Sequence, residues 1–153
     1  MEQFVIKSGI TQWGNVDTYN LIIPNDKVEI FKANISQHAA ETFSRVIFNT
    51  PSIVSNITNY AFEGCKMLEG ITIPYSVTTI GRGAFKNCTS LQKIAFGGNL
   101  VNEIKEDAFY GCSSLATITI PDSVTSIGGS AFWGCTSLAS INIPDGVIII
   151  GKR

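Results

Sequence analysis

Residues 71–91 read ITIPYSVTTIGRGAFKNCTSL, and residues 118–138 read ITIPDSVTSIGGSAFWGCTSL. The two stretches agree at most positions, and looser copies of the pattern lie on either side of the first one. One phenylalanine per copy recurs at intervals of 23, 24 and 23 residues: Phe62, Phe85, Phe109 and Phe132. Cysteine, leucine and isoleucine keep the same intervals: Cys65, Cys88, Cys112 and Cys135, then Leu68, Leu91, Leu115 and Leu138, then Ile71, Ile94, Ile118 and Ile141. Several residue types in one phase, with a period between about 20 and 50 residues, predict a repeat protein.

The chemistry within one unit explains this period. Ile118-Thr119-Ile120 alternates apolar and polar residues and ends at Pro121, which is typical of a short strand. Val124 and Ile127 form a second apolar anchor on the return path. Ala131-Phe132 then begins one expected helical turn, and a glycine or asparagine closes it: Gly64, Asn87, Gly111 and Gly134. Glycine and asparagine tolerate the left-handed conformation of a C-cap, so a positive φ is expected in this column.

The spacing divides residues 48–153 into units 48–70, 71–93, 94–117 and 118–140 and a half-unit, 141–153. No single unit can bury its apolar columns, so stacking must bury them together. The predicted fold is an α/β repeat, a solenoid of stacked units. We expect one parallel β-sheet, short return strands, one-turn helices and an N-terminal cap.

Residues 1–47 fit the period less well and are expected to be the capping segment. Residues 4–13 predict a hairpin or a half-repeat, and residues 21–24, LIIP, resemble the strand and proline of a degenerate repeat. Apolar residues at helical spacing predict a short helix over 35–45. Solenoids need atypical terminal units to shield the exposed end of the core.

The pattern I-x-I-P-x-S-V-T-x-I-G-x-x-A-F-x-x-C-x-S-L of residues 71–91 and 118–138 resembles the BspA-type leucine-rich repeat. The resemblance covers residues 48–153. It implies a leucine-rich-repeat solenoid used for protein–protein or host-surface contact, without catalytic residues. Members of that family are commonly secreted or displayed on the surface of bacteria and protists.

Composition excludes several classes of function. The net charge is −1 and no block of one sign occurs, which argues against nucleic acid and anionic membranes as partners. The longest apolar run, Val147–Ile150, is far shorter than the roughly 20 residues that span a bilayer. The first residues, MEQFVIK, lack the pattern of a secretory signal. We therefore expect a cytoplasmic protein if the chain is complete, and a surface or secreted one if it is a fragment of a longer family member.

Candidate chemistry in the chain is sparse. The four cysteines occur once per unit, whereas zinc ligands come in pairs two to four residues apart, so we predict buried, reduced thiols and no metal site. The only histidine, His38, has no nucleophile placed beside it by any motif. We expect no catalytic residues and no cofactor.

Two surfaces are candidates for binding a protein or glycan partner. One is the outer face of the strands, where the column between the inward residues reads Asn49, Thr72, Ala95, Thr119 and Asn142. The column before it reads Ile47, Gly70, Lys93, Thr117 and Ser140. The other surface holds Tyr110 and Trp133, which follow the repeated phenylalanine in successive units. These aromatic residues suit a binding hot spot, and packing on the neighbouring turn explains them equally well.

The sequence therefore predicts a non-enzymatic protein–protein interaction module. One alternative is a fragment of a bacterial or protist surface adhesin. Another is a small intracellular inhibitor or effector that acts by steric masking. The final strand, with Ile148 and Ile149 in place of polar residues, also predicts a two-fold homodimer through the C-terminal edge, with a C-terminal continuation of the chain as the competing explanation.

Overall fold

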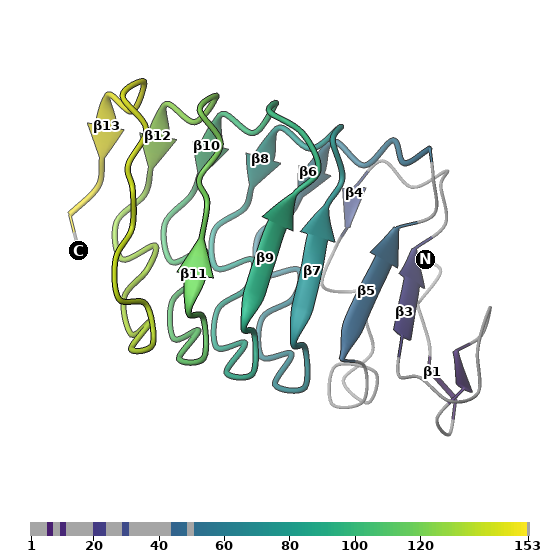
Figure 1. Cartoon of the computed structure of the whole chain (residues 1–153). Helices are drawn as coiled ribbons and strands as arrows, with labels where there is room; N and C mark the ends of the chain where they lie inside the picture. Colours follow the sequence, from purple (N-terminus) through teal and green to yellow (C-terminus); the bar gives the residue numbers. More distant parts are fainter. Residues whose placement is uncertain are drawn as a thin grey trace.

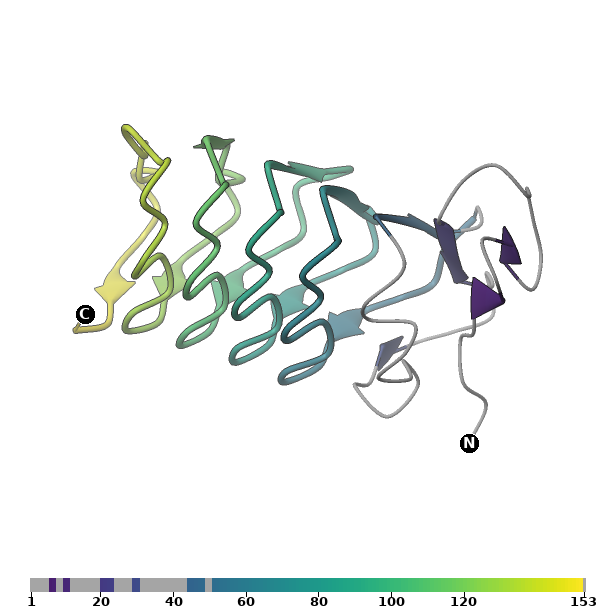
Figure 2. The same ribbon diagram turned by 90° about the horizontal axis from the view of Figure 1, so that it is seen from below.

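A computed structural model describes the backbone of residues 6–7, 10–11, 20–23 and 29–30 and the complete residues 44–48 and 51–152. The chain forms a solenoid of stacked coils, with β3 (Asn20–Ile23) and β13 (Ile149–Ile150) at opposite ends of the stack (Figure 1). Seen from below, successive coils repeat one outline along a single axis (Figure 2). The predicted solenoid is confirmed.

Two parallel sheets run along the solenoid. The five-stranded sheet has the order β11-β9-β7-β5-β3, and the six-stranded sheet has the order β13-β12-β10-β8-β6-β4. The other strands of the five-stranded sheet are β5 (Arg45–Phe48), β7 (Gly70–Ile73), β9 (Lys93–Phe96) and β11 (Thr117–Ile118). Those of the six-stranded sheet are β4 (Glu29–Ile30), β6 (Asn56–Ile57), β8 (Thr79–Ile80), β10 (Glu103–Ile104) and β12 (Ser126–Ile127).

The expectation of one parallel sheet was therefore incomplete, because the return strands pair as well. Ile57 lies beside Ile80, and Ile80 lies beside Ile104, each in parallel register. These side chains are fully buried, so each return strand is anchored at the same depth in successive coils. The backbone groups of the return strands then satisfy one another across the stack.

The expected one-turn helices are wrong for the described residues, which contain no helix. In the turn around Phe62, backbone N–H groups alternate between two kinds of acceptor. The N–H of Ala61 donates to the Thr58 carbonyl in the same coil at 3.1 Å, and that of Phe62 donates to the Ala84 carbonyl of the next coil at 2.7 Å. A helix would direct both bonds within its own segment.

Two columns of positive φ produce this alternation. The predicted column is confirmed, with φ between 60° and 76°: Gly64, Asn87, Gly111 and Gly134. A second column, which the sequence analysis missed, has φ between 56° and 60°: Tyr60, Gly83, Asp107 and Ser130. The four residues of the second column are of four different types, so no pattern in the sequence indicates a positive φ at this position.

The core is built from the predicted apolar columns. The repeated isoleucine, cysteine and leucine are buried through the middle coils, and Phe62, Phe85 and Phe109 are fully buried. At the C-terminal end, Phe132, Leu138 and Ile141 are only partly buried. The apolar side chains of the core are therefore less completely buried in the last coil.

The N-terminal segment joins the stack. β1 (Ile6–Lys7) and β2 (Ile10–Thr11) pair antiparallel, within the stretch for which a hairpin or a half-repeat was expected. β3 pairs in parallel with β5, as the strand-like residues 21–24 predicted. The helix expected over 35–45 falls outside the described residues except at its last two positions, and Arg45 there belongs to β5. The capping role of residues 1–47 stays a prediction.

The register of the first coil differs from the predicted one. Arg45 pairs with Gly70 and Val46 with Ile71, whereas the repeat spacing placed Ile47 opposite Gly70. The chain between Phe48 and Val54 is two residues longer than the segment between Ile73 and Val77, so the strand starts earlier than a constant period implies.

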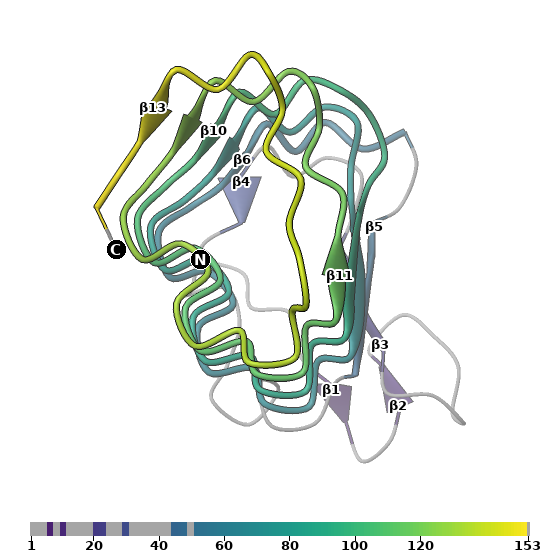
Figure 3. The same ribbon diagram turned by 60° about the vertical axis from the view of Figure 1, so that its left-hand side comes forward.

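The last coil is attached mainly through the six-stranded sheet. β13 pairs with β12, while the five-stranded sheet ends at β11 and residues 139–146 form no strand. Figure 3, which looks obliquely along the stack, shows the final yellow coil displaced from the column of the preceding strands.

In the described part of the chain, no helix has the length and apolar character that crossing a membrane requires.

Candidate functional site

The strand face is the outward surface of the five-stranded sheet, with residues Arg45, Ile47, Gly70, Thr72, Lys93, Ala95, Thr117 and Thr119. In β7, Ile71 and Ile73 are buried and Thr72 is exposed, so alternation places every second side chain on this face. The register pairs Thr72 with Ala95. The structure thus brings the predicted residues of four neighbouring strands together.

Of the three other predicted strand-face residues, two do not join this surface and the third is outside the described part of the chain. Asn49 lies outside the described residues. Ser140 and Asn142 are exposed, but they belong to the last coil, where no strand extends the five-stranded sheet. Arg45 does belong to the strand face and was missed, because the predicted register started the first unit after it.

Three hollows adjoin one another on the strand face. The cation notch, of about 320 Å³, is lined by Arg45, Val46, Ile47, Gly70, Ile71, Thr72, Lys93 and Ala95. The Tyr75 hollow, of about 380 Å³, is lined by Val46, Ile47, Phe48, Ser52, Thr72, Ile73, Pro74, Tyr75 and Gly97. The β9–β11 hollow, of about 460 Å³, extends from Lys93 and Ala95 to Thr119 and Asp122. Shared lining residues make the three a continuous, open surface.

The other candidate surface lies on the turns. Tyr110 and Trp133 occupy equivalent positions in successive coils, where the N–H of Gly111 donates to the Trp133 carbonyl at 2.7 Å. Trp133 is 46% exposed. The Lys86 ammonium lies 4.8 Å from the centroid of the Tyr110 ring, so this aromatic face already holds a cation from its own chain.

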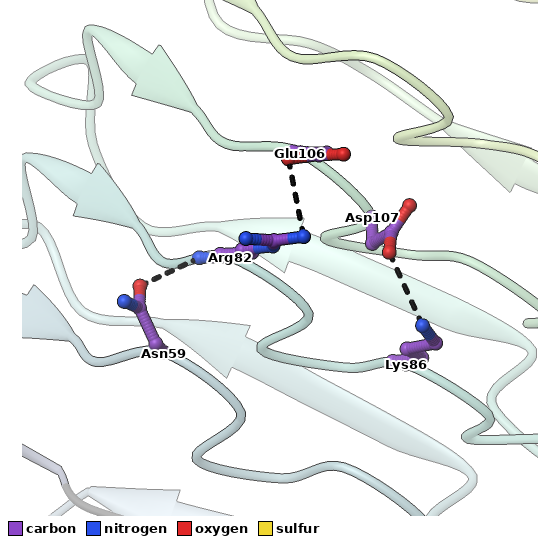
Figure 4. Close-up of polar contacts among 5 residues, drawn as sticks. All are labelled: Asn59, Arg82, Lys86, Glu106 and Asp107. Atoms are coloured by element: carbon purple, nitrogen blue, oxygen red, sulfur yellow. Dashed lines mark hydrogen bonds and ion pairs between the residues drawn. The ribbon is translucent and has the colours of Figure 1, made fainter.

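Polar side chains link three coils on the turns (Figure 4). Lys86 Nζ lies 3.1 Å from Asp107 Oδ2, and Arg82 lies 3.4 Å from Glu106. The backbone N–H of Arg82 donates to Asn59 Oδ1 at 2.9 Å. The hydrogen bond to Asp107 raises the pKa of Lys86. Arg82 and Lys86 are therefore paired within the protein.

The cysteines form a buried column of free thiols. Cys88 Sγ donates to the Phe62 carbonyl at 3.1 Å, and Cys112 and Cys135 make the equivalent bonds one coil further on each time. Burial raises the pKa of Cys112 to about 12 and that of Cys135 to about 11. Such thiols stay protonated at neutral pH and are poor nucleophiles. Among the described residues, no group of three or more His, Cys, Asp or Glu side chains is placed to hold a metal ion.

Comparison with solved structures finds the same fold in bacterial leucine-rich-repeat proteins. The Leucine Rich Repeat protein of T. pallidum is 27% identical, with a TM-score of 0.68 over 98% of this chain and 61% of its own. The pneumococcal vaccine antigen PcpA is 26% identical, with a TM-score of 0.66 over 84% of this chain and 31% of its own. A leucine rich cell surface protein of Faecalibacterium prausnitzii is 29% identical, with a TM-score of 0.55 over 84% of this chain and 39% of its own.

This chain therefore spans less than two thirds of the length of each of these proteins. No curated protein sequence matches it. The model of the BspA type Leucine rich repeat region matches residues 21–153 with six copies, which begins well before the predicted array at residue 48. The chain belongs to the BspA-type leucine-rich repeat family.

Proposed function

We propose that the chain is a non-enzymatic protein-interaction module that holds a macromolecular partner against its strand face. The observation that carries this proposal is the continuity of the three hollows, which cross four neighbouring strands and share lining residues. Sites for small molecules are concave and bury most of their ligand, whereas this surface is open. An extended partner can contact all three hollows at once.

The strand face is also held rigidly, which favours binding. β5, β7 and β9 are fixed by parallel pairing on both sides, β11 pairs with β9, and the turns of the coils are bonded coil to coil. A preformed surface loses little conformational entropy when a partner binds. The buried, protonated thiols and the paired charges of the turns suit the support of that surface better than catalysis.

Affinity capture with matched variants tests the proposal. The double variant Thr72→Trp/Thr119→Trp places two large uncharged side chains on the strand face, at exposed positions where the core is untouched. We expect it to lose a partner that the unmodified chain retains, while Tyr110→Ala/Trp133→Ala retains it. The reverse result, with loss only in the aromatic variant, assigns binding to the turns and contradicts the strand-face proposal.

A second candidate is a portion of a surface adhesin. The likeness to a cell surface protein of F. prausnitzii favours it, together with the short share of the relatives' length that this chain spans. Brief protease treatment of intact cells that produce the protein tests this candidate. Digestion before lysis supports surface display, and protection until lysis contradicts it.

A further inference from the structure

We propose that the cation notch binds a carboxylate of an acidic segment of a partner protein, and that a large apolar side chain of the same segment enters the Tyr75 hollow. This proposal rests on the proposed function, because it names the chemistry of the partner that the strand face holds. Four observations lead to it.

The first is the placement of two cations. Gly70 pairs with Arg45 on one side and with Lys93 on the other, so the two cationic residues flank a glycine in one outward column. Two parallel strand spacings separate their backbones by about 10 Å. Side chains as long as those of arginine and lysine can both reach a group bound between them, and both line the same hollow.

The second is that the fold does not require the glycine between them. Gly70 has no positive φ, and a Cβ added to it would lie 3.7 Å from the Lys93 carbonyl, an ordinary contact. At Gly81, by contrast, an added Cβ would lie 2.6 Å from the Ile57 carbonyl, so that glycine is a packing requirement. The missing side chain at position 70 leaves the floor of the cation notch open.

The third is that the charges of Arg45 and Lys93 are not used within the described part of the chain. Both side chains are exposed, and neither makes an ion pair there, even with Glu69 beside Gly70. Arg82 and Lys86 on the turns, in contrast, are each paired with a carboxylate. An arginine fork binds a carboxylate through two parallel hydrogen bonds, and a nearby lysine adds a second charge.

The fourth is the apolar character of the adjoining Tyr75 hollow. Ile47 is 42% exposed and Tyr75 is 56% exposed, and both line it. Gly97 also lines it, and an added Cβ there would lie 2.9 Å from the Ile73 carbonyl oxygen, so the fold requires a glycine at this position. The Tyr75 hollow and the cation notch share Val46, Ile47 and Thr72, so a carboxylate and an apolar side chain close together in one segment can occupy both.

The rest of the strand face sets the direction of such a segment. Asp122 lines the β9–β11 hollow at the far side of the sheet and carries the opposite charge from the cation notch. A partner segment with its acidic residue at β5–β9 and a neutral or basic residue towards Asp122 is complementary to this arrangement. An acidic segment in the opposite orientation places like charges together.

Selection of random displayed heptapeptides on the immobilised full chain tests the proposal. We expect selected peptides to carry Asp or Glu close to a large apolar residue. Arg45→Gln/Lys93→Gln removes both charges at nearly constant size and should bind these peptides at least tenfold more weakly. Lys66→Gln/Lys152→Gln removes the same charge from exposed positions off the strand face and should leave binding unchanged.

A third variant separates the shape of the cation notch from its charge. Gly70→Leu keeps both cations and fills the floor between them, and its Cβ has room in the fold. It should weaken peptide binding without lowering the melting temperature. The proposal is overturned if Arg45→Gln/Lys93→Gln and Lys66→Gln/Lys152→Gln weaken peptide binding equally. It is also overturned if no peptide is enriched on the unmodified chain.

Two further outcomes also overturn it and show what replaces it. Peptides without acidic residues that are lost on Thr72→Trp/Thr119→Trp leave the proposed function standing and reject the role of the cations. Binding of heparin fragments through Arg45 and Lys93, without an acidic preference among peptides, assigns the cation notch to an anionic glycan.

Discussion

The rings of Phe85 and Phe109 lie face to face, with centroids 5.4 Å apart and planes within 2° of parallel. Phe62 stacks on Phe85 and Phe132 stacks on Phe109 in the same way. The rings are parallel because each coil repeats the backbone of the one before it. The core is therefore a one-dimensional stack, and each interior ring supports two neighbours.

We predict that Phe109→Ala lowers the free energy of unfolding by about 3–5 kcal/mol. Phe109 is fully buried and contacts a ring on both sides, so its removal leaves a cavity between two coils. Phe132 is only partly buried, and Phe132→Ala should cost less. Urea unfolding followed by circular dichroism measures both losses. Equal losses would contradict the difference in burial between the two rings.

A second prediction separates backbone strain from crowding at the closing position of the turn. Gly64 has φ of +72°, and an added Cβ would find no atom within 4 Å. Gly64→Val should therefore destabilise the protein by about 1–2 kcal/mol through the left-handed backbone alone. Gly64→Asn should cost much less, since Asn87 has φ of 60° at the equivalent position. Equal losses in thermal unfolding would rule out backbone conformation as the cause.

The sequence predicted the core columns and the strand face because both depend on a period. Repeated Phe, Cys and Leu positions identify the buried side chains, and the alternation Ile71-Thr72-Ile73 identifies which residue points outward. The turn was not predictable in the same way. Ala61 is a strong helix former, and only the neighbouring coil supplies the carbonyl that draws the Phe62 N–H out of a helical pattern.

The candidate site was predicted in part for a related reason. Thr72 and Ala95 followed from the period, whereas Arg45 did not, because the longer segment after Phe48 shifts the register of the first strand. The cation notch also needs two residues about 50 positions apart, Arg45 and Lys93, on either side of one glycine. Only strand pairing brings them together.

A third prediction concerns pH. Burial raises the pKa of Cys112 to about 12, whereas an unfolded cysteine titrates near 8.5. Between these values the unfolded chain loses a proton that the folded chain keeps, so the free energy of unfolding falls as pH rises. Each such thiol contributes up to about 1.4 kcal/mol per pH unit. Urea midpoints measured from pH 8 to pH 11 should decrease, and Cys112→Ala should flatten the decrease.

The same burial predicts slow reaction of the thiols. In the native protein at pH 8, Cys65, Cys88 and Cys112 should react with a thiol reagent only as fast as the chain opens. Four thiols should react at once in denaturant. Rapid native reaction of the interior cysteines would show that the column is accessible.

The C-terminal edge carries the last prediction. β13 pairs only with β12, and its neighbourhood is apolar: Ile148, Ile149 and Ile150 are 81%, 58% and 63% exposed. A strand edge with unpaired backbone groups and apolar side chains is a template for pairing with another chain.

Unused backbone donors lie on the same end of the solenoid. In the preceding coil, the N–H of Phe109 donates to the Ala131 carbonyl and that of Gly111 to the Trp133 carbonyl. The equivalent backbone N–H groups of the last coil, those of Phe132 and Gly134, donate to no described residue. The terminal coil thus presents donors and an apolar strand edge together, and a second copy can cover both.

We therefore predict a two-fold dimer through β13 at micromolar concentration, measured by light scattering. Ile148→Lys/Ile149→Lys places like charges on both copies of the edge and should give a monomer with an unchanged melting temperature. Ile53→Lys/Met67→Lys makes the same change at half-exposed positions elsewhere and should remain a dimer. A monomeric unmodified chain contradicts the prediction. Dissociation by both double variants would place the interface away from β13, because lysine at positions 53 and 67 leaves this edge intact.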